Sequence, residues 1–134
     1  MKAADTSLVI AAFASWHENH EAARRALDSG LRLIEHCVLE TYSVLTRLPA
    51  PHRTSASVIR DFLKTRFPQP FLRLSTRAYR DFMFTLPDHG VSGGAAYDAL
   101  VAATAAECQT ELVSCDRRAM AVYERYGVRI QLLA

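Results

Sequence analysis

The chain has 134 residues, a usual length for one compact domain, so we expect a single domain over 1–134. Half of the residues are hydrophobic and 22% are charged, a balance that excludes a disordered or fibrous chain. Sixteen basic residues against 14 acidic ones give a formal net charge of +2, too small to indicate a nucleic-acid binder by itself. All but two of the basic residues are arginine, which suits bidentate contacts with phosphate and carboxylate groups.

The cysteines and the longest apolar run indicate a cytoplasmic protein. Cys37, Cys108 and Cys115 are odd in number and lack CxxC spacing, which argues against a disulfide scaffold or a zinc knuckle. The longest strictly apolar run, residues 8–14, is far shorter than the about 20 residues that a transmembrane helix needs. Its end resembles a signal-peptidase site only faintly, because the run is short and follows the acidic Asp5. We therefore expect no membrane span and no secretion.

Strand and helix patterns alternate along the chain. In chain order, we expect a strand at 2–4, helices at 8–15 and 17–29, a strand at 31–34, helices at 37–48 and from 54 or 55 to 67, a strand at 71–74, helices from 75 or 76 to 87 and at 95–108, a strand at 111–114, a helix at 116–126 and a strand at 128–133. Such alternation predicts an α/β fold, a three-layer α/β/α domain around a mostly parallel sheet of about five strands. The helix at 95–108 is apolar almost all round, which predicts burial on most of its sides.

Four acidic residues fall where an open parallel sheet binds ligands, beyond the carboxyl ends of its strands. Asp5 directly follows the first strand, and Asp116 follows the strand at 111–114 with one residue between them. Asp98 is expected in the first turn of the apolar helix, and Glu40 in the first turn of the helix after the second strand. Helices after parallel strands begin at the edge where those strands end, so all four carboxylates can converge on one rim.

A divalent cation is the expected occupant of that rim. Asp98 stands in an almost wholly apolar segment, and burying a lone carboxylate is costly, while clustered carboxylates repel and retain protons. A hard cation removes both penalties, and an all-oxygen set without histidine or thiolate indicates Mg²⁺ or Mn²⁺ rather than zinc. Such ions accept phosphate oxygens, which indicates metal-assisted hydrolysis of a phosphodiester. With the four acids set aside, ten acidic residues face the 16 basic ones, a surface suited to RNA or DNA.

Each acid also has a plainer explanation. Asp5 and Asp116 can be helix N-caps, and Asp98 and Glu40 can be first-turn charges that interact favourably with a helix dipole. The joint pattern favours a site, because four acids at one edge are more than capping requires and neighbouring hydroxyl residues could cap instead.

These segments resemble the PIN-domain ribonucleases, and specifically the VapC toxins of bacterial type II toxin–antitoxin systems. One such motif alone is weak, but four in order over essentially the whole chain are fairly specific. The matching segments are Asp5-Thr6-Ser7, Leu39-Glu40 with Val44-Leu45-Thr46-Arg47-Leu48-Pro49, Tyr97-Asp98-Ala99-Leu100-Val101-Ala102-Ala103-Thr104-Ala105 and Leu112-Val113-Ser114-Cys115-Asp116-Arg117-Arg118.

The resemblance implies a PIN-like fold and a Mg²⁺- or Mn²⁺-dependent endoribonuclease toxin that hydrolyses phosphodiester bonds of tRNA or another structured RNA. It implies Asp5 and Asp98 as the principal metal ligands. Glu40 and Asp116 would complete the acidic set through water or a second ion and orient the attacking water. The position of Asp116 is the least constant of the four in the family.

Two hydroxyl residues, Thr6 and Ser114, are implied as supports behind these ligands. The family often has threonine where Ser114 stands, and serine keeps the hydroxyl.

The resemblance also implies a homodimer and a cognate VapB-type antitoxin, whose C-terminal segment lies in a groove and often directs an arginine at the acids. Here the groove would use the apolar helix faces of 8–13 and 58–67, for which core packing is the plainer explanation. The alternative function is a non-cleaving PIN-like module that binds RNA or protein, and the complete acid set argues against it.

Some residues fit other sites less well. His17 and His20 have a spacing that can bind metal. Cys37 or Cys115 could act as a nucleophile paired with His36 or His89. A solvated helix face and a small buried hydrophobe are the plainer interpretations. Arg117 and Arg118 either contact phosphate or form an exposed helix face, and both interpretations stay open.

Overall fold

Strands and helices alternate in the computed structural model, which describes residues 1–133. The strands are β1 (Lys2–Ala4), β2 (Arg32–Leu33), β3 (Glu111–Ser114) and β4 (Ile130–Leu132). The helices are α1 (Thr6–Phe13), α2 (His20–Asp28), α3 (Glu35–Arg47), α4 (Ala56–Arg66), α5 (Thr76–Thr85), α6 (Ala95–Glu107) and α7 (Met120–Glu124), with 3-10 turns η1 (Pro87–His89) and η2 (Arg117–Ala119). The predicted α/β fold is confirmed.

The sheet has the order β2-β1-β3-β4, and every pair of neighbours is parallel. At the carboxyl end of β1, Ala4 pairs with Leu33 on one side and with Val113 on the other. Crossovers of this kind place the segments that follow β1, β2 and β3 at one edge of the sheet. The predicted convergence of those segments therefore follows from the topology.

The prediction of about five strands was wrong, because the described sheet has four. The segment expected at 71–74 makes one isolated parallel bridge, between Leu72 and Ile34, with two backbone hydrogen bonds of 2.9 Å. Pro70 precedes it without an N–H to donate, and Ser75 follows as the N-cap of α5, so too few residues remain to extend the ladder.

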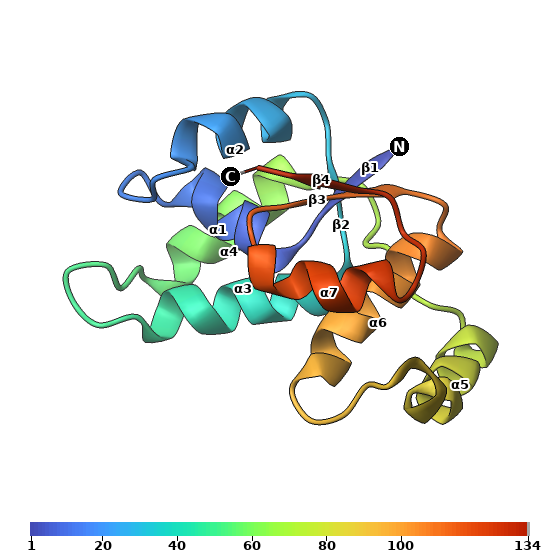
Figure 1. The fold of residues 1–134 in the computed structure, drawn as a ribbon. Helices are drawn as coiled ribbons and strands as arrows, with labels where there is room; N and C mark the ends of the chain where they lie inside the picture. The colour runs from blue at the N-terminus through green and yellow to red at the C-terminus, as the bar shows by residue number, and fades with distance from the viewer. Residues whose placement is uncertain (134) are drawn as a thin grey trace.

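Helices lie on both sides of this sheet. Figure 1 shows α2 on one side of the strands and α6 and α7 on the other, with α5 at the end of the molecule away from α2. Helix α6 contacts α3, α5, α7 and β3, as its nearly all-round apolar sequence predicted. Its alanines Ala99, Ala102 and Ala105 are fully buried, which lets the neighbouring elements approach its backbone closely.

The apolar faces of α1 and α4 are mostly core rather than groove. Leu8, Ile59 and Leu63 belong to one buried cluster, and the rings of Phe13 and Phe62 meet edge to face at 4.9 Å between centroids. Core packing, the plainer explanation of the apolar faces of α1 and α4, therefore holds for these residues.

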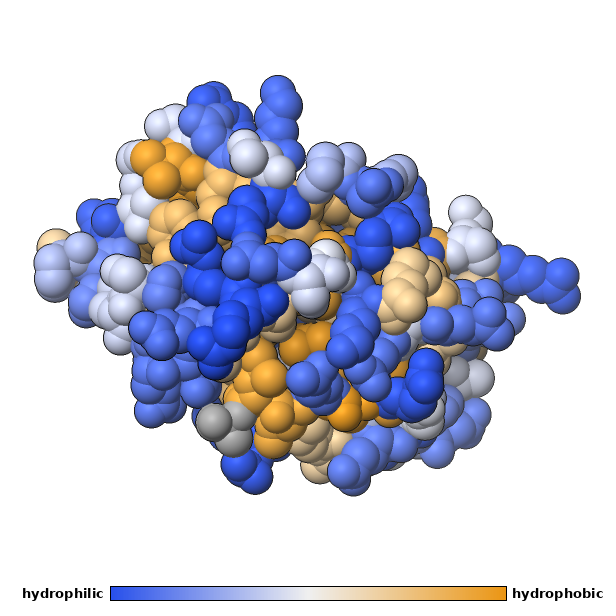
Figure 2. All heavy atoms as spheres, turned by 90° about the horizontal axis from the view of Figure 1, so that it is seen from above, coloured by the Kyte–Doolittle hydropathy of each residue, from blue (hydrophilic) through white to orange (hydrophobic). Residues whose placement is uncertain are grey.

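Figure 2 shows one face of the molecule, where hydrophilic residues cover most of the surface and hydrophobic ones appear between them. Within residues 1–133, no helix has the length and apolar character that a membrane crossing requires.

Helix starts differ from the sequence predictions because tertiary contacts set them. Asp5 itself caps α1, so this helix begins at Thr6, two residues earlier than expected. Helix α3 begins at Glu35, so Glu40 lies in its second turn and not in the first. The single helix expected at 116–126 is divided into η2 and α7.

Candidate active site

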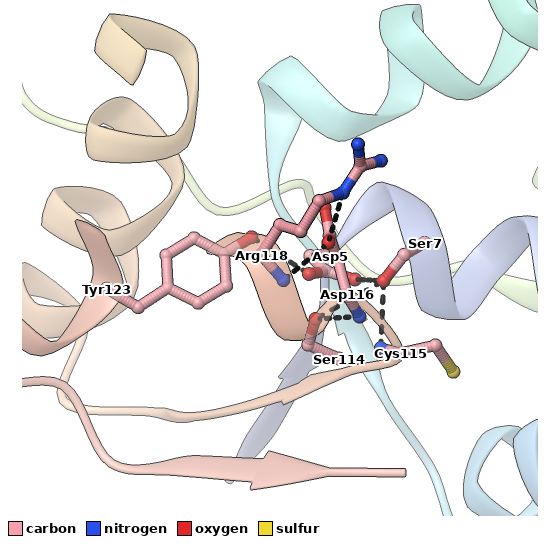
Figure 3. Close-up of polar contacts among 7 residues, drawn as sticks. All are labelled: Asp5, Ser7, Ser114, Cys115, Asp116, Arg118 and Tyr123. Atoms are coloured by element: carbon pink, nitrogen blue, oxygen red, sulfur yellow. Dashed lines mark hydrogen bonds and ion pairs between the residues drawn. The ribbon is translucent and has the colours of Figure 1, made fainter. Parts of the chain in front are cut away.

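Asp5 is the most completely held of the predicted site residues. It leaves β1 in an extended conformation, and its side chain accepts a hydrogen bond from the Leu8 amide at 3.0 Å. The same oxygen, Oδ1, accepts from Ser7 Oγ at 2.6 Å, and Oδ2 accepts from the Tyr123 hydroxyl at 2.8 Å. Figure 3 shows Tyr123 reaching Asp5 from α7, on the opposite side from Ser7. The carboxylate is therefore fixed in one orientation although it is only 2% exposed.

Burial sets the protonation chemistry of Asp5. Loss of solvent raises the pKa of the Asp5 carboxyl, and the hydroxyls of Ser114, Ser7 and Tyr123 and the Leu8 amide each oppose that rise. A cation beside Asp5 would oppose it further, because it stabilises the ionised form.

Hydroxyl groups join the end of β1 to the end of β3. Ser7 Oγ lies 3.2 Å from Ser114 Oγ and accepts a hydrogen bond of 2.8 Å from the Cys115 amide. Ser114 Oγ in turn accepts from the Asp116 amide at 3.0 Å. These bonds hold the turn after β3, which carries Asp116, against the start of α1 (Figure 3).

Asp116 is both a cap and a member of the rim. Its carboxylate accepts a hydrogen bond from the Arg118 amide at 3.0 Å and so caps η2. The Arg118 side chain is 97% exposed, and its Nε lies 3.9 Å from Asp116 Oδ1, too far for a strong pair in water. Capping, the plainer explanation, is thus true of Asp5 and of Asp116, and neither carboxylate is neutralised by a close arginine.

Asp98 lies in the first turn of α6, close to the other three acids. Burial raises the pKa of its carboxyl, and the negative charges of Asp116, Glu40 and Asp5 raise it further. Within residues 1–133, no lysine, arginine or histidine forms an ion pair with Asp98. His36 opposes the rise in the pKa of Asp98, as the smallest of the causes. The structure thus brings the four acids within electrostatic range and leaves Asp98 without an ion pair in the described residues.

Glu40 differs from the other acids because a histidine accompanies it. His36, one turn earlier on α3, places Nε2 3.7 Å from Glu40 Oε2. This ring is the main cause that lowers the pKa of Glu40; burial opposes it, and the Thr6 hydroxyl lowers it further. Glu40 is therefore ionised at neutral pH.

The donor set fits a hydrated Mg²⁺ or Mn²⁺ ion. Among residues 1–133, no three histidine, cysteine, aspartate or glutamate side chains are grouped closely enough to hold one ion. Mg²⁺ does not require such a group, because it keeps several waters and is usually bound through one or two carboxylates. One observation favours a cation here: Asp98 is half-buried among three other carboxylates and forms no ion pair within residues 1–133.

The competing sites have less support. Burial raises the pKa of Cys115 to about 11, so its sulfur is a neutral thiol at physiological pH and a poor nucleophile. His17 Nδ1 accepts a hydrogen bond from the Asn19 amide, and His20 Nδ1 contacts the Ala11 carbonyl at 2.9 Å. Both histidine rings thus have local structural partners.

Three supporting residues were not predicted as part of the site. Ser7 was quoted only within the motif Asp5-Thr6-Ser7, and its contact with Asp5 could have been inferred from that position. His36 could have been found from its helical spacing to Glu40. Tyr123 gave no such signal, because 118 residues separate it from Asp5 and only the packing of α7 brings them together.

Comparisons with known proteins agree with this arrangement. The family described as PIN domain matches residues 3–125. Ribonuclease VapC40 of Mycobacterium tuberculosis is 47% identical over 133 residues, which are 99% of each chain. Ribonuclease VapC27 of the same organism is 39% identical over 142 residues, covering 98% of this chain and 96% of that one.

A solved structure gives the same fold. The crystal structure of FitAcB from Neisseria gonorrhoeae matches with a TM-score of 0.69, covering 97% of this chain and 96% of that chain. At 18% identity, this likeness shows the fold alone. With the family match and the two close relatives, the chain is a member of the PIN-domain family and belongs among its VapC proteins.

Proposed function

We propose that this chain is a divalent-metal-dependent endoribonuclease and the toxin of a type II toxin–antitoxin pair. The observation that carries the proposal is Asp98, a half-buried carboxylate set among three others and without an ion pair in the described residues. Such an arrangement costs stability unless a cation binds, so it is expected at a working metal site rather than at a purely structural one. The relatives named ribonucleases VapC40 and VapC27 support the same activity.

The four acids have different roles in the proposed site. Asp5 and Asp98 would hold Mg²⁺ or Mn²⁺ directly, and Glu40 and Asp116 would act through water. When bound, the ion supplies Lewis-acid polarisation of the scissile phosphate and lowers the pKa of a water nucleophile. Ser7 and Tyr123 keep Asp5 in its binding orientation. Glu40, whose pKa is lowered, stays ionised and can orient a water by accepting a hydrogen bond from it.

We further propose the partners that this family implies. The chain would act as one domain and as a homodimer in the cytoplasm, with structured RNA as its substrate. A cognate antitoxin would silence it, and Asp98, which has no ion pair within residues 1–133, offers an arginine of that antitoxin a favourable partner.

Cleavage of a labelled tRNA by the purified protein tests the nuclease. We expect cleavage with Mn²⁺, none with EDTA, and a loss of about 100-fold or more in Asp98→Asn, because one metal ligand loses its charge. Asp81→Asn, on the exposed part of α5, is the matched control and should cleave like the wild type. Metal-dependent cleavage that survives in folded Asp98→Asn would contradict the site. Binding of RNA without cleavage by the wild type would favour the non-cleaving module.

Expression in a bacterial host tests the toxin assignment. We expect growth arrest when the chain is expressed alone and recovery when its cognate VapB-type antitoxin is co-expressed. Asp98→Asn should not arrest growth. Harmless expression of a protein that cleaves RNA in vitro would contradict the toxin assignment and leave the nuclease intact.

A further inference from the structure

An exposed aromatic stack stands directly beside the acidic rim. Tyr97 precedes Asp98 on α6, and its ring lies parallel to that of His36 on α3, with 5.5 Å between centroids and 11° between planes. His36 is also the residue beside Glu40, at 3.7 Å from its carboxylate. The stacked pair therefore adjoins Glu40, and its tyrosine is the chain neighbour of Asp98.

The protein interior does not account for the exposure of Tyr97. Its side chain is 60% exposed, whereas the buried contacts of α6 are made by residues such as Ala99 and Ala102, which are fully buried. His36 covers part of the tyrosine, and most of the remainder faces solvent. His36 also lines a cleft of about 470 Å³ together with Leu39 and Leu100, so the adjoining surface is hollowed rather than convex.

We propose that Tyr97, supported from behind by His36, is a stacking platform for an unpaired base of the RNA next to the phosphate that is cleaved. This inference rests on the proposed nuclease function and names a specificity determinant for it. Proteins recognise single-stranded RNA mainly by stacking splayed bases on aromatic side chains, and every base offers a flat face for such contact. His36 contacts both Tyr97 and Glu40, so a phosphate held at the acidic rim would place a neighbouring base within reach of the Tyr97 ring. The nuclease would thus require an unpaired nucleotide at the cut, with little preference for which base it is.

A fluorescent base measures this contact without cleavage. The probe is a short single-stranded RNA with one 2-aminopurine, moved along the strand. It is bound in Mn²⁺ to Asp116→Asn protein, which keeps the two proposed direct ligands Asp5 and Asp98. Stacking quenches 2-aminopurine, so we expect strong quenching at one or two neighbouring positions. Adding Tyr97→Leu should abolish that quenching and weaken RNA binding about tenfold, whereas Tyr97→Phe should change binding less than about twofold, because it keeps the ring.

Kinetics on the otherwise unchanged protein give a second readout. Tyr97→Leu should raise the KM for single-stranded RNA about tenfold and leave kcat within about threefold, because the platform binds substrate before and during the reaction. Phe84→Leu is the matched control, since Phe84 is 68% exposed on α5, and it should change neither value. Thermal melting should be the same for all these variants, because both side chains are largely solvated.

The outcomes separate this inference from the nuclease itself. A wild type that cleaves, with Tyr97→Leu equal to it in KM and quenching, would overturn the platform alone. Tyr97-dependent quenching in a wild type that cannot cleave would overturn the nuclease and keep the platform. If Tyr97→Leu left RNA binding unchanged and weakened binding of the antitoxin, Tyr97 would be a protein contact and the platform would be wrong.

Discussion

Asp5 and Asp98 lie at the same edge of the sheet, but the surroundings of their carboxylates differ. Asp5 is 2% exposed and accepts hydrogen bonds from Ser7, Leu8 and Tyr123. Asp98 is half-buried, and its nearest charged neighbours include three further carboxylates. One acid is rigidly oriented and the other is electrostatically unbalanced. The fold thus fixes the orientation of Asp5 by hydrogen bonds and leaves Asp98 with charge that a bound cation would balance.

The largest effect that separates the two acids is on folding. Asp5→Ala should lower the free energy of unfolding by about 3 kcal/mol, because it removes an N-cap and leaves the buried Tyr123 hydroxyl without an acceptor. Asp98→Ala should change it by less than about 0.5 kcal/mol, since no described side chain depends on that carboxylate for an ion pair. Urea denaturation in EDTA measures both. Equal losses in the two variants would refute the contrast.

Mn²⁺ binding should neutralise the clustered carboxylates and so stabilise the folded state. Mn²⁺ at about 100 times its dissociation constant should stabilise the folded wild type by about 2.7 kcal/mol, because only the folded chain brings the acids together. Asp98→Asn should lose most of this gain, whereas Asp81→Asn should keep it. Denaturation at a series of Mn²⁺ concentrations, with binding checked by calorimetry, gives the two numbers. Stabilisation of Asp98→Asn equal to that of the wild type would place the ion elsewhere.

The sequence was sufficient to predict this rim but not how each acid is held there. Strand ends are visible in the alternation of segments, and Asp5 and Asp116 could be placed by counting from them. Which group caps a helix depends on neighbours distant in the chain: Asp5 caps α1 although Thr6 and Ser7 were available. The hydroxyl of Tyr123 reaches Asp5 only because α7 packs back toward β1, a contact that no local pattern encodes.

The strand count failed for a related reason. Residues 71–74 alternate like a strand, but a strand exists only through its partners, and the flanking Pro70 and Ser75 leave one bridge. The second-turn position of Glu40 has the same origin. Helix α3 starts two residues before the expected position, where the Glu35 amide donates to the Leu72 carbonyl instead.

A smaller effect tests the orientation of Asp5 directly. Tyr123→Phe should cost about 1–2 kcal/mol of unfolding free energy and weaken Mn²⁺ binding several-fold, because one donor to the buried carboxylate is lost. Tyr126→Phe is the matched control: Tyr126 Oη is buried without a hydrogen-bond partner in the described residues, so removing it should cost nothing or stabilise slightly. Calorimetric Mn²⁺ binding separates orientation from stability. Unchanged Mn²⁺ affinity in Tyr123→Phe would assign the tyrosine to folding alone.

The smallest effect concerns the charge of Asp98 in the metal-free protein. Burial and the neighbouring carboxylates raise its pKa in the folded state more than His36 lowers it, so the folded chain holds this proton more tightly than the unfolded chain does. The resulting penalty is absent below the ordinary carboxyl pKa of about 4, grows as the pH rises, and is complete above the raised pKa. Asp98→Asn should therefore be more stable than the wild type by about 0.5 kcal/mol at neutral pH and low salt, a value that allows for solvent screening. The difference should vanish in acid and shrink in high salt, where the charges are screened. Unfolding curves at several pH values in EDTA check the sign of this stability difference. If Asp98→Asn were more stable than the wild type only in acid, a basic group would already balance Asp98. The four acids would then need no cation.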